Sequence, residues 1–375
     1  MRRCLVLVFL LFLGKASLCQ FNNTALENRI RPDSSLTGEL HFDFYNFNFV
    51  RNYEYTNNFH DGYTIYGAQF QPQLVYYAHP NLALTGGVFY RKDFGNGGVS
   101  LVKPLFSIKY QKNDLSLIFG SLEGGIQHHY VEPIYDFERQ LTNPLEYGTQ
   151  LLLEKKAIKL DAWIAWQNMI YKGSDYKEEI IGGLSMEATV TEDNGWKLSL
   201  PGQFLAQHRG GQIDELKQIP VQTLFNGATG IKLHKKFQGR VTEVYTDNYI
   251  VGYKDFSKQR DQNYMGGFGL WLTAGMDTKY GSLLATYWGG NNFITIKGMP
   301  LYESVSENLY DQGFTQNHRN VLSVRYAYQK ELLPNFYLDV RFEPHFDLDH
   351  ADHQLQFNHS FFLTYKKSFK LLKIK

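Results

Sequence analysis

Alternation of apolar and polar residues recurs along almost the whole chain and constrains its fold more than any other feature. The clearest case is the segment 335–343, where every second residue from Phe336 to Phe342 is apolar and the residues between them are polar or charged. A period of two is typical of a β-strand with one apolar and one polar face. The same pattern recurs at 158–164 and 322–326. The chain is therefore predicted to be an all-β protein.

Sixteen such strands are predicted between residues 38 and 369. Their connections alternate between tight turns and longer loops, which is the layout of an outer-membrane barrel. The predicted strands span 38–51, 62–78, 82–94, 100–111, 114–122, 146–155, 157–170, 178–191, 195–208, 221–235, 238–254, 264–278, 282–297, 319–331, 335–346 and 354–369.

Contact with lipid explains why such a sheet should close on itself. Lipid cannot satisfy free backbone N–H and C=O groups, so a membrane-spanning sheet must have no open edge. The alternative is a secreted β-sandwich or propeller, but strands of soluble proteins average only about five or six residues. We therefore predict a closed antiparallel transmembrane β-barrel of about 16 strands, with a range of roughly 14 to 18.

Residues 1–19 are predicted to be a secretory signal peptide. Arg2 and Arg3 form a basic start, an apolar run follows, and small residues precede the expected cleavage point. The apolar run is too short to cross a bilayer as a helix. Cleavage after Cys19 removes that residue and Cys4, which are the two cysteines of the chain. The mature protein would then have neither a disulfide nor a thiolate metal site.

Three regions are expected after the signal peptide. Residues 20–37 form a short periplasmic N-terminal segment, residues 38–369 form the transmembrane barrel, and residues 370–375 form a basic C-terminal tail. The whole chain has 38 basic and 37 acidic residues, and removal of the signal peptide takes away three basic ones. The near-neutral balance that remains gives no support for a nucleic-acid partner.

With these features the chain resembles a Gram-negative outer-membrane barrel of the porin type. The resemblance rests on architecture, including an aromatic last strand that carries Phe357, Phe361, Tyr365 and Phe369 on one face. It implies an outer-membrane location and contact with outer-membrane lipid. We expect neither the plug domain of an energy-coupled transporter nor the periplasmic domain of an assembly barrel, because residues 20–37 are too few for either. Homo-oligomers of the barrel are an open alternative.

Charged residues mark a predicted constriction of the lumen. In porins of sixteen strands the loop corresponding to 123–145 folds into the lumen, and the resemblance implies the same here. Acidic loop residues would then face arginines of the late strands and set the field that a solute crosses. The alternatives are an outward-facing loop and simple ion pairs between neighbouring strands. The lumen candidates are Glu123, Glu132, Asp136, Glu138, Lys159, Asp161, Arg325, Asp339, Arg341 and Glu343.

A loop rich in His and Asp follows the strand predicted at 335–346. Carboxylates and imidazoles are metal ligands, but the spacing lacks the central Gly and the closing Glu of a calcium-binding EF-hand loop. We expect a hydrated surface loop, with no metal or other cofactor in the protein. The weak metal candidates are Asp347, Asp349, His350, Asp352 and His353.

No catalytic sequence motif for a hydrolase, metalloprotease or nucleotide-binding enzyme occurs in the chain. His359 and Ser360 are adjacent, so on a strand they point to opposite faces. We therefore expect a protein that is not an enzyme, namely a channel for passive or weakly selective passage of small hydrophilic solutes. Two alternatives remain: a barrel with a closed lumen whose surface loops bind a ligand, glycan or partner, and a membrane-embedded enzyme.

Overall fold

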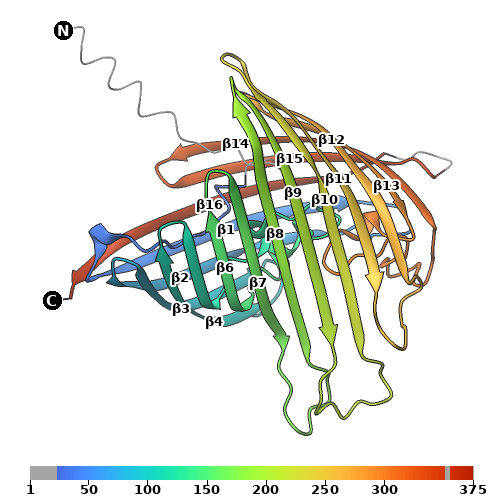
Figure 1. Ribbon diagram of the computed structural model, residues 1–375, viewed down its shortest axis with the longest axis horizontal. Helices are drawn as coiled ribbons and strands as arrows, with labels where there is room; N and C mark the ends of the chain where they lie inside the picture. The colour runs from blue at the N-terminus through green and yellow to red at the C-terminus, as the bar shows by residue number, and fades with distance from the viewer. Residues whose placement is uncertain (1–22, 351–354, 375) are drawn as a thin grey trace.

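The computed structural model describes residues 23–350 and 355–374, so the predicted signal peptide lies outside the described residues (Figure 1). Its sixteen strands form one closed antiparallel barrel in which each strand pairs with its neighbours in the chain and β16 pairs with β1. The predicted fold class and strand count are confirmed. The strands are β1 (Glu39–Glu54), β2 (Thr64–His79), β3 (Leu82–Asp93), β4 (Leu101–Lys112), β5 (Leu115–Ser121), β6 (Tyr147–Glu154), β7 (Ile158–Asn168), β8 (Glu179–Asp193), β9 (Trp196–Arg209), β10 (Gln222–Lys236), β11 (Val241–Asp255), β12 (Gly266–Thr278), β13 (Gly281–Asn291), β14 (His318–Leu333), β15 (Phe336–Asp347) and β16 (Leu355–Lys373).

Two strand ends differ clearly from the sequence prediction. The strand expected at 282–297 ends at Asn291, because residues 292–297 leave the wall and enter the lumen. The last strand continues to Lys373, where it pairs with Glu39 of β1. Residues 370–373 are therefore part of the wall, and the expected tail beyond residue 369 is corrected to the last few residues.

The connections divide the barrel into two rims. Alternate connections have two to four residues and the others have seven to 26. The first and last strands begin and end on the short-turn rim, which is the periplasmic side in barrels of this type (Figure 1). The short helices are η2 (Ser34–Leu36), η3 (Gly125–His128), α2 (Arg139–Thr142) and η4 (Pro300–Tyr302). Within the described residues, no helix is long and apolar enough to span a bilayer.

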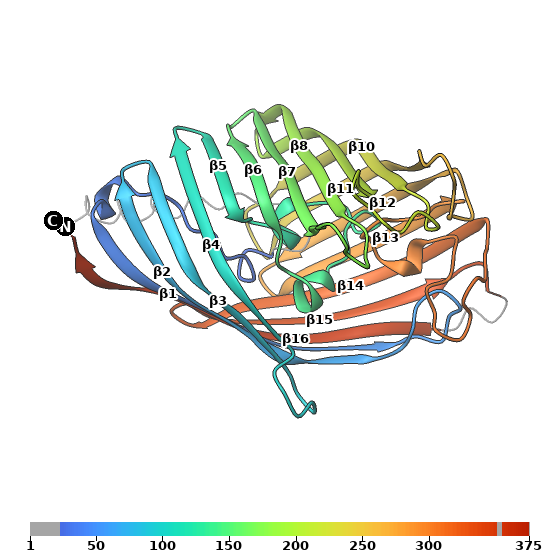
Figure 2. The same ribbon diagram turned by 90° about the horizontal axis from the view of Figure 1, so that it is seen from below.

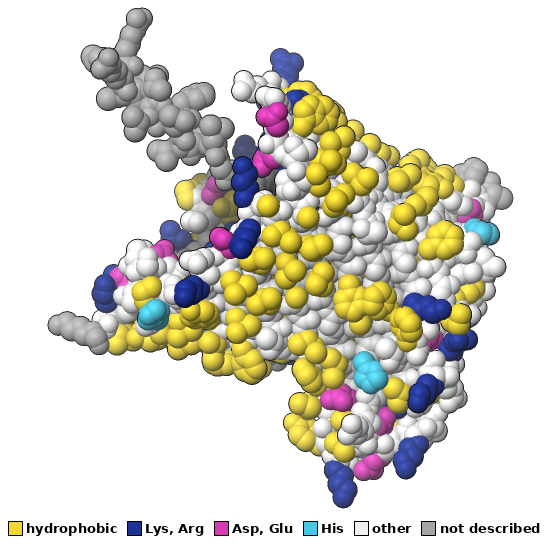
Figure 3. All heavy atoms as spheres, in the orientation of Figure 1, with side chains coloured by type: hydrophobic (Ala, Val, Ile, Leu, Met, Phe, Trp, Pro, Cys, Tyr) yellow, Lys and Arg dark blue, Asp and Glu magenta, His cyan; other side chains and the backbone are white. Residues whose placement is uncertain are grey.

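The period of two assigns each strand one outer and one inner face. In β15 the side chains of Asp339, Arg341 and Glu343 are buried on the lumen side, whereas Phe342 between them is exposed on the outside. Apolar side chains spread over the outer wall, and charged ones gather towards the two ends (Figure 3). This distribution suits a barrel whose middle contacts lipid.

Three segments fill the lumen rather than leaving it open. They are the connection 122–146, the connection 292–317 and the N-terminal residues from 23 onward; Figure 2 shows the teal helix α2 of the first between opposite walls. Tyr45 of β1 donates a hydrogen bond to the carbonyl of Leu26 at 2.8 Å. One continuous cluster of buried apolar side chains joins the two long connections to strands around most of the wall. The barrel is therefore packed inside like a soluble protein core.

Candidate functional site

The connection 122–146 is anchored to the wall by a buried histidine. His128 lies between two carboxylates, with Nε2 2.7 Å from Glu146 and Nδ1 2.7 Å from Asp161 of β7. Its ring stacks on Trp163 at a centroid distance of 4.4 Å. Burial alone would lower the pKa of His128, but the two carboxylates outweigh burial and raise it to about 9. The imidazolium is charged at neutral pH and holds the connection inside the barrel.

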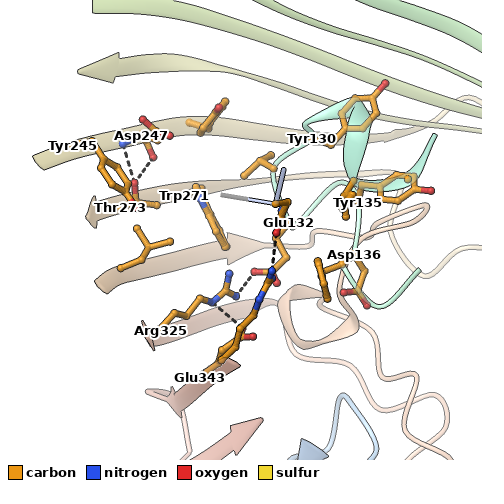
Figure 4. A pocket seen from close by; sticks show the side chains of 18 of the residues that line it. Tyr130, Glu132, Tyr135, Asp136, Tyr245, Asp247, Trp271, Thr273, Arg325 and Glu343 are labelled. Carbon is orange, nitrogen blue, oxygen red and sulfur yellow. Dashed lines mark hydrogen bonds and ion pairs between the residues drawn. The ribbon is translucent and has the colours of Figure 1, made fainter. Parts of the chain in front are cut away.

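The middle of the lumen contains a network of opposite charges around a cavity of about 90 Å³. Glu132 of the connection 122–146 forms an ion pair with Arg325 of β14 and accepts a hydrogen bond from Tyr302 at 3.0 Å. Glu343 of β15 lies 3.3 Å from Arg325 and 3.1 Å from Arg51 of β1. Figure 4 shows Arg325 reaching between Glu132 and Glu343. Glu132, Arg325, Glu343 and Arg51 thus each have a partner of opposite charge, which offsets the cost of their burial.

The other acidic candidates of this connection do not oppose the arginines. Glu123 pairs with Lys109 of β4 at 2.6 Å. Glu138 accepts a hydrogen bond from Tyr63 at 2.6 Å, close to the long-loop rim. Asp136 is buried, and burial together with neighbouring Glu138 raises its pKa to about 7. Of these acidic residues, only Glu132 forms an ion pair with one of the two predicted arginines.

The wall candidates have local partners. Arg341 lies 2.9 Å from Asp339, two residues earlier on the same face of β15, and also donates to Asn23 at 2.8 Å. Asp161 is held by His128, as described above. Lys159 is half-buried on the lumen side of β7 and belongs to a second cavity near the short-turn rim.

The loop with the weak metal candidates is held by protein contacts. Asp347 pairs with Arg319 at 2.6 Å, and Asp349 accepts hydrogen bonds from Asn320 at 2.5 and 2.8 Å. His350 is exposed, and Asp352 and His353 lie outside the described residues. Over residues 23–350 and 355–374, no three His, Cys, Asp or Glu side chains gather as a metal site requires.

The connection 292–317 is the lumen element that sequence reasoning missed. The buried side chain of Asn226 on β10 donates to the carbonyl of Ile294 at 2.9 Å. Lys297 lies 3.7 Å from Glu146, so the two long connections contact one another. Burial lowers the pKa of Lys297 to about 8, although Glu146 opposes this shift. The alternating sequence from Phe293 to Ile296 resembles the end of a strand, which is why residues 292–297 were predicted as wall.

A serine and a histidine meet on the lumen face in the long-loop half of the barrel. Ser323 of β14 and His345 of β15 are cross-strand partners, with Oγ 2.6 Å from Nδ1. Nε2 of His345 lies 3.1 Å from the side-chain amide of Asn358 on β16. The Ser and His side chains are 1% exposed and that of Asn358 is 0% exposed. A hydroxyl beside an imidazole that is oriented by a third group is the arrangement of an activated nucleophile.

The contact of Asn358 with Nε2 of His345 is made by Nδ2, a donor, and this orientation would leave the proton of the ring on Nδ1. Nδ2 of Asn358 also donates to the hydroxyl of Tyr55 at 3.1 Å, whereas the buried Oδ1 of Asn358 has no partner among the described residues. With the amide turned so that Oδ1 faces Nε2, Asn358 would hold the proton there. Nδ1 would then be free to accept the proton of Ser323.

Two long-rim segments cover this serine. Asn57 accepts hydrogen bonds from the backbone N–H groups of Phe59 and His60 at 2.7 and 2.8 Å and donates to Gln356 at 2.6 Å. Ser306, from the connection 292–317, donates to the carbonyl of Asn58 at 2.5 Å. The two segments also make apolar contact, since the buried ring of Phe59 packs on that of Phe314 at a centroid distance of 5.5 Å. Access of a substrate to Ser323 therefore requires both the polar and the apolar contacts to separate.

Comparison with known proteins gives a family and a fold. The sequence model of the family described as Lipid A 3'-O-deacylase-type matches residues 30–374. This family is named for an enzyme activity, so the prediction that the protein is not an enzyme is wrong. No curated protein sequence matches the chain.

Solved structures of outer-membrane proteins share the fold at low identity. Vibrio cholerae OmpT lacking loop L8 is 11% identical, with a TM-score of 0.51 over 88% of this chain and 99% of the other. In-vitro folded Vibrio cholerae OmpT in its trimer form is 9% identical, with a TM-score of 0.50 over 88% of this chain and 100% of the other. Pseudomonas aeruginosa OccK1 is 11% identical, with a TM-score of 0.50 over 89% and 100%. The predicted porin-type barrel and outer-membrane location are confirmed.

Proposed function

Because the chain belongs to the lipid A 3'-O-deacylase-type family, we propose that it is an outer-membrane hydrolase that removes an ester-linked acyl chain from a lipid A-type glycolipid. The observation that carries the proposal within the molecule is the 2.6 Å contact between Ser323 and His345. The pair lies in the long-loop half of the barrel, which in this architecture is the half directed to the outer leaflet. Lipid A is a component of that leaflet.

The proposed reaction is acyl transfer to Ser323 followed by hydrolysis. Its Oγ attacks the ester carbonyl carbon while His345 takes the hydroxyl proton, and the C–O bond to the sugar then breaks. His345 returns that proton to the departing sugar oxygen. A water molecule attacks the resulting acyl-serine in the same way and releases a free fatty acid.

Positive charge is available next to the reacting atoms. Arg325 follows Ser323 by two residues on the lumen face of β14, and Arg51 and Arg325 together bracket Glu343. Negative charge that develops on the carbonyl oxygen would be stabilised by these guanidinium groups in a water-poor region. Glu132 and Tyr302 hold Arg325 in place.

Purified protein in detergent tests the proposal with lipid A as substrate and free fatty acid as the measured product. Ser323→Ala and His345→Gln should each reduce release by about 10³-fold or more. Ser199→Ala is the matched control, because this lumen serine is buried and its hydroxyl has no partner among the described residues. Full activity in the Ser323→Ala protein would exclude Ser323 as the nucleophile.

Passage of small solutes is the second candidate function. A barrel of sixteen strands is wide enough for an aqueous channel, and the structures that share its fold are outer-membrane barrels. The packed connections 122–146 and 292–317 favour a lumen that stays closed unless they move. Conductance in a planar bilayer separates the two functions, since a closed hydrolase should give no steady current.

The proposed function also indicates which molecules contact this protein in the membrane. Outer-membrane lipid contacts the apolar outer wall, and lipid A would be both neighbour and substrate. Association of barrels remains a proposal, supported by the existence of a trimer form of the Vibrio cholerae protein. Crosslinking in native membranes tests it by the mass of the product.

A further inference from the structure

A cavity of about 300 Å³ lies near the short-turn rim, at the opposite end of the lumen from Ser323. Its walls come from strands β6 to β10, from the N-terminal segment and from the connection 122–146. The proposed acyl transfer uses none of these wall residues. Figure 3 shows charged side chains of both signs around a hollow at this end, beside the grey segment.

Positive charge exceeds negative charge around this cavity. Glu154 is shared by Arg29 at 3.4 Å and Arg31 at 3.1 Å. Glu187 is shared in the same way by Lys197 at 2.5 Å and Lys232 at 2.8 Å. Glu27 also pairs with Arg29 at 3.2 Å, so these four cations share three carboxylates and exceed them by one positive charge before Lys159 is counted.

The remaining acidic residue of the cavity also has a partner. Asp161 is already held by the imidazolium of His128 at 2.7 Å. Burial raises the pKa of Glu27, although Arg29 opposes the shift. His129 also lines the cavity. Burial lowers its pKa to about 3, and the positive charges of Arg29, Lys232 and Lys159 lower it further. The neutral ring faces Arg29, with Nε2 3.1 Å from the guanidinium.

Among the described residues, Lys159 is the cation of this cavity for which no ion pair or hydrogen bond is found. In the strand register it lies between Glu154 and Glu187, and other cations hold both of these carboxylates. Within residues 23–350 and 355–374, Lys159 forms neither an ion pair nor a hydrogen bond. A half-buried ammonium in this position carries a desolvation cost that a bound anion would offset.

We infer that this cavity is a binding site for a small organic anion that carries a phosphate or carboxylate group, with Lys159 as its principal contact. The cavity is larger than one ordered ion needs, and Leu152, Met186 and Pro201 give it an apolar side. Buried Oε1 of Gln127 also lines it and has no partner within the described part of the chain, so it can accept a hydrogen bond from a ligand hydroxyl. The expected ligand is therefore a hydroxylated acid such as a sugar phosphate or sugar acid.

Isothermal titration of the full-length purified protein in detergent tests the inference. The probes are glucose 6-phosphate and gluconate, with glucose as the neutral analogue. Both anions should bind and glucose should not, and binding should weaken as the ionic strength rises. Lys159→Gln should weaken anion binding by about tenfold or more, the size expected for loss of one charged hydrogen bond.

Two further variants make the test specific. Lys155→Gln removes an exposed lysine on the adjacent turn and should leave the affinity unchanged. Glu187→Gln frees Lys197 and Lys232 from their shared carboxylate and should tighten binding. Retention of heat-modifiable migration by each variant shows that the barrel is folded. Absence of heat with both anions at millimolar concentration, or equal affinity in the wild-type and Lys159→Gln proteins, would overturn the inference.

Discussion

At the scale of single residues, the proposed active site depends on hairpin register. Ser323 lies ten residues before the end of β14 and His345 nine residues after the start of β15, a register shift next to the turn brings the two opposite each other, and both lie on the lumen face. The alternating pattern and the predicted turn are therefore sufficient to place these two residues near each other on one face of the hairpin. A search for motifs in which catalytic residues are close in sequence could not find it. The cover over the pair was not predictable, because it depends on contacts between two loops that are far apart in the sequence.

Replacement of Asn358 tests its role as the residue that orients His345. Asn358→Ala should lower kcat of fatty-acid release by about 10²-fold, because a small displacement of a catalytic group can cost that much. KM should stay close to the wild-type value, since Asn358 would not touch the acyl chain. A rise in KM with unchanged kcat would instead assign Asn358 to substrate binding.

His128 should make the docking of the connection 122–146 dependent on pH. Its pKa is raised from the ordinary 6.5 to about 9. The protonated ring therefore stabilises the docked state fully below about pH 6.5, and this contribution is lost as the pH rises through about 9. Limited proteolysis of the connection should accelerate above pH 9.

His128→Gln is the control for that experiment. It should accelerate cleavage at neutral pH, since breaking a buried ion pair costs about 3–5 kcal/mol. It should also remove the acceleration of cleavage that sets in as the pH rises through about 9. Lys297 acts in the opposite direction, because its pKa is lowered to about 8. Unchanged cleavage in the variant at all pH values would show that His128 does not hold the connection.

At the scale of elements, strands were far easier to predict than the connections that fill the lumen. A strand is specified by its own period of two and by two flanking turns, and these signals are local. The inward course of 292–317 depends on distant contacts such as Asn226 to Ile294, which no local pattern contains. The charges of the connection 122–146 indicated that it lies in the lumen. Glu123 and Glu138, however, contact Lys109 and Tyr63 rather than the arginines that the sequence suggested.

Gly269 on β12 supports the connection 292–317 indirectly. A Cβ there would lie 2.1 Å from the ring of Trp288, which is fully buried and donates to the carbonyl of Tyr302 at 3.0 Å. Gly269→Val should displace the indole and destabilise the folded barrel by about 1–3 kcal/mol. Unfolding in urea measures the change. Gly86→Val is the control, because a Cβ at Gly86 meets no atom within 4 Å.

The facing of β15 gives a second prediction at this scale. Val340 lies on the outer face near the middle of the strand, so Val340→Arg should cost about 2–4 kcal/mol in the bilayer and impair assembly. Asp339→Asn changes the neighbouring lumen-facing residue and adds no charge to the lipid face. Equal assembly of both variants would contradict the assigned faces, since a shift of one residue exchanges them.

At the scale of the whole molecule, the barrel combines a porin-type wall with a packed interior. The wall alone would form a channel, whereas the connections 122–146 and 292–317 meet in the lumen and close it. Deletion of residues 124–144 should therefore raise conductance in a planar bilayer well above that of the wild-type protein. Wild-type conductance equal to that of an open sixteen-strand pore would show that the connections do not block it.

The central claim is that this barrel hydrolyses lipid A at Ser323. Its most direct test is mass spectrometry of lipid A from isogenic Gram-negative cells that express the wild-type or the Ser323→Ala protein at equal outer-membrane levels. Lipid A from the wild-type cells should lack one ester-linked acyl chain, and lipid A from the Ser323→Ala cells should be fully acylated. Identical lipid A in both, whether acylated or deacylated, would contradict it.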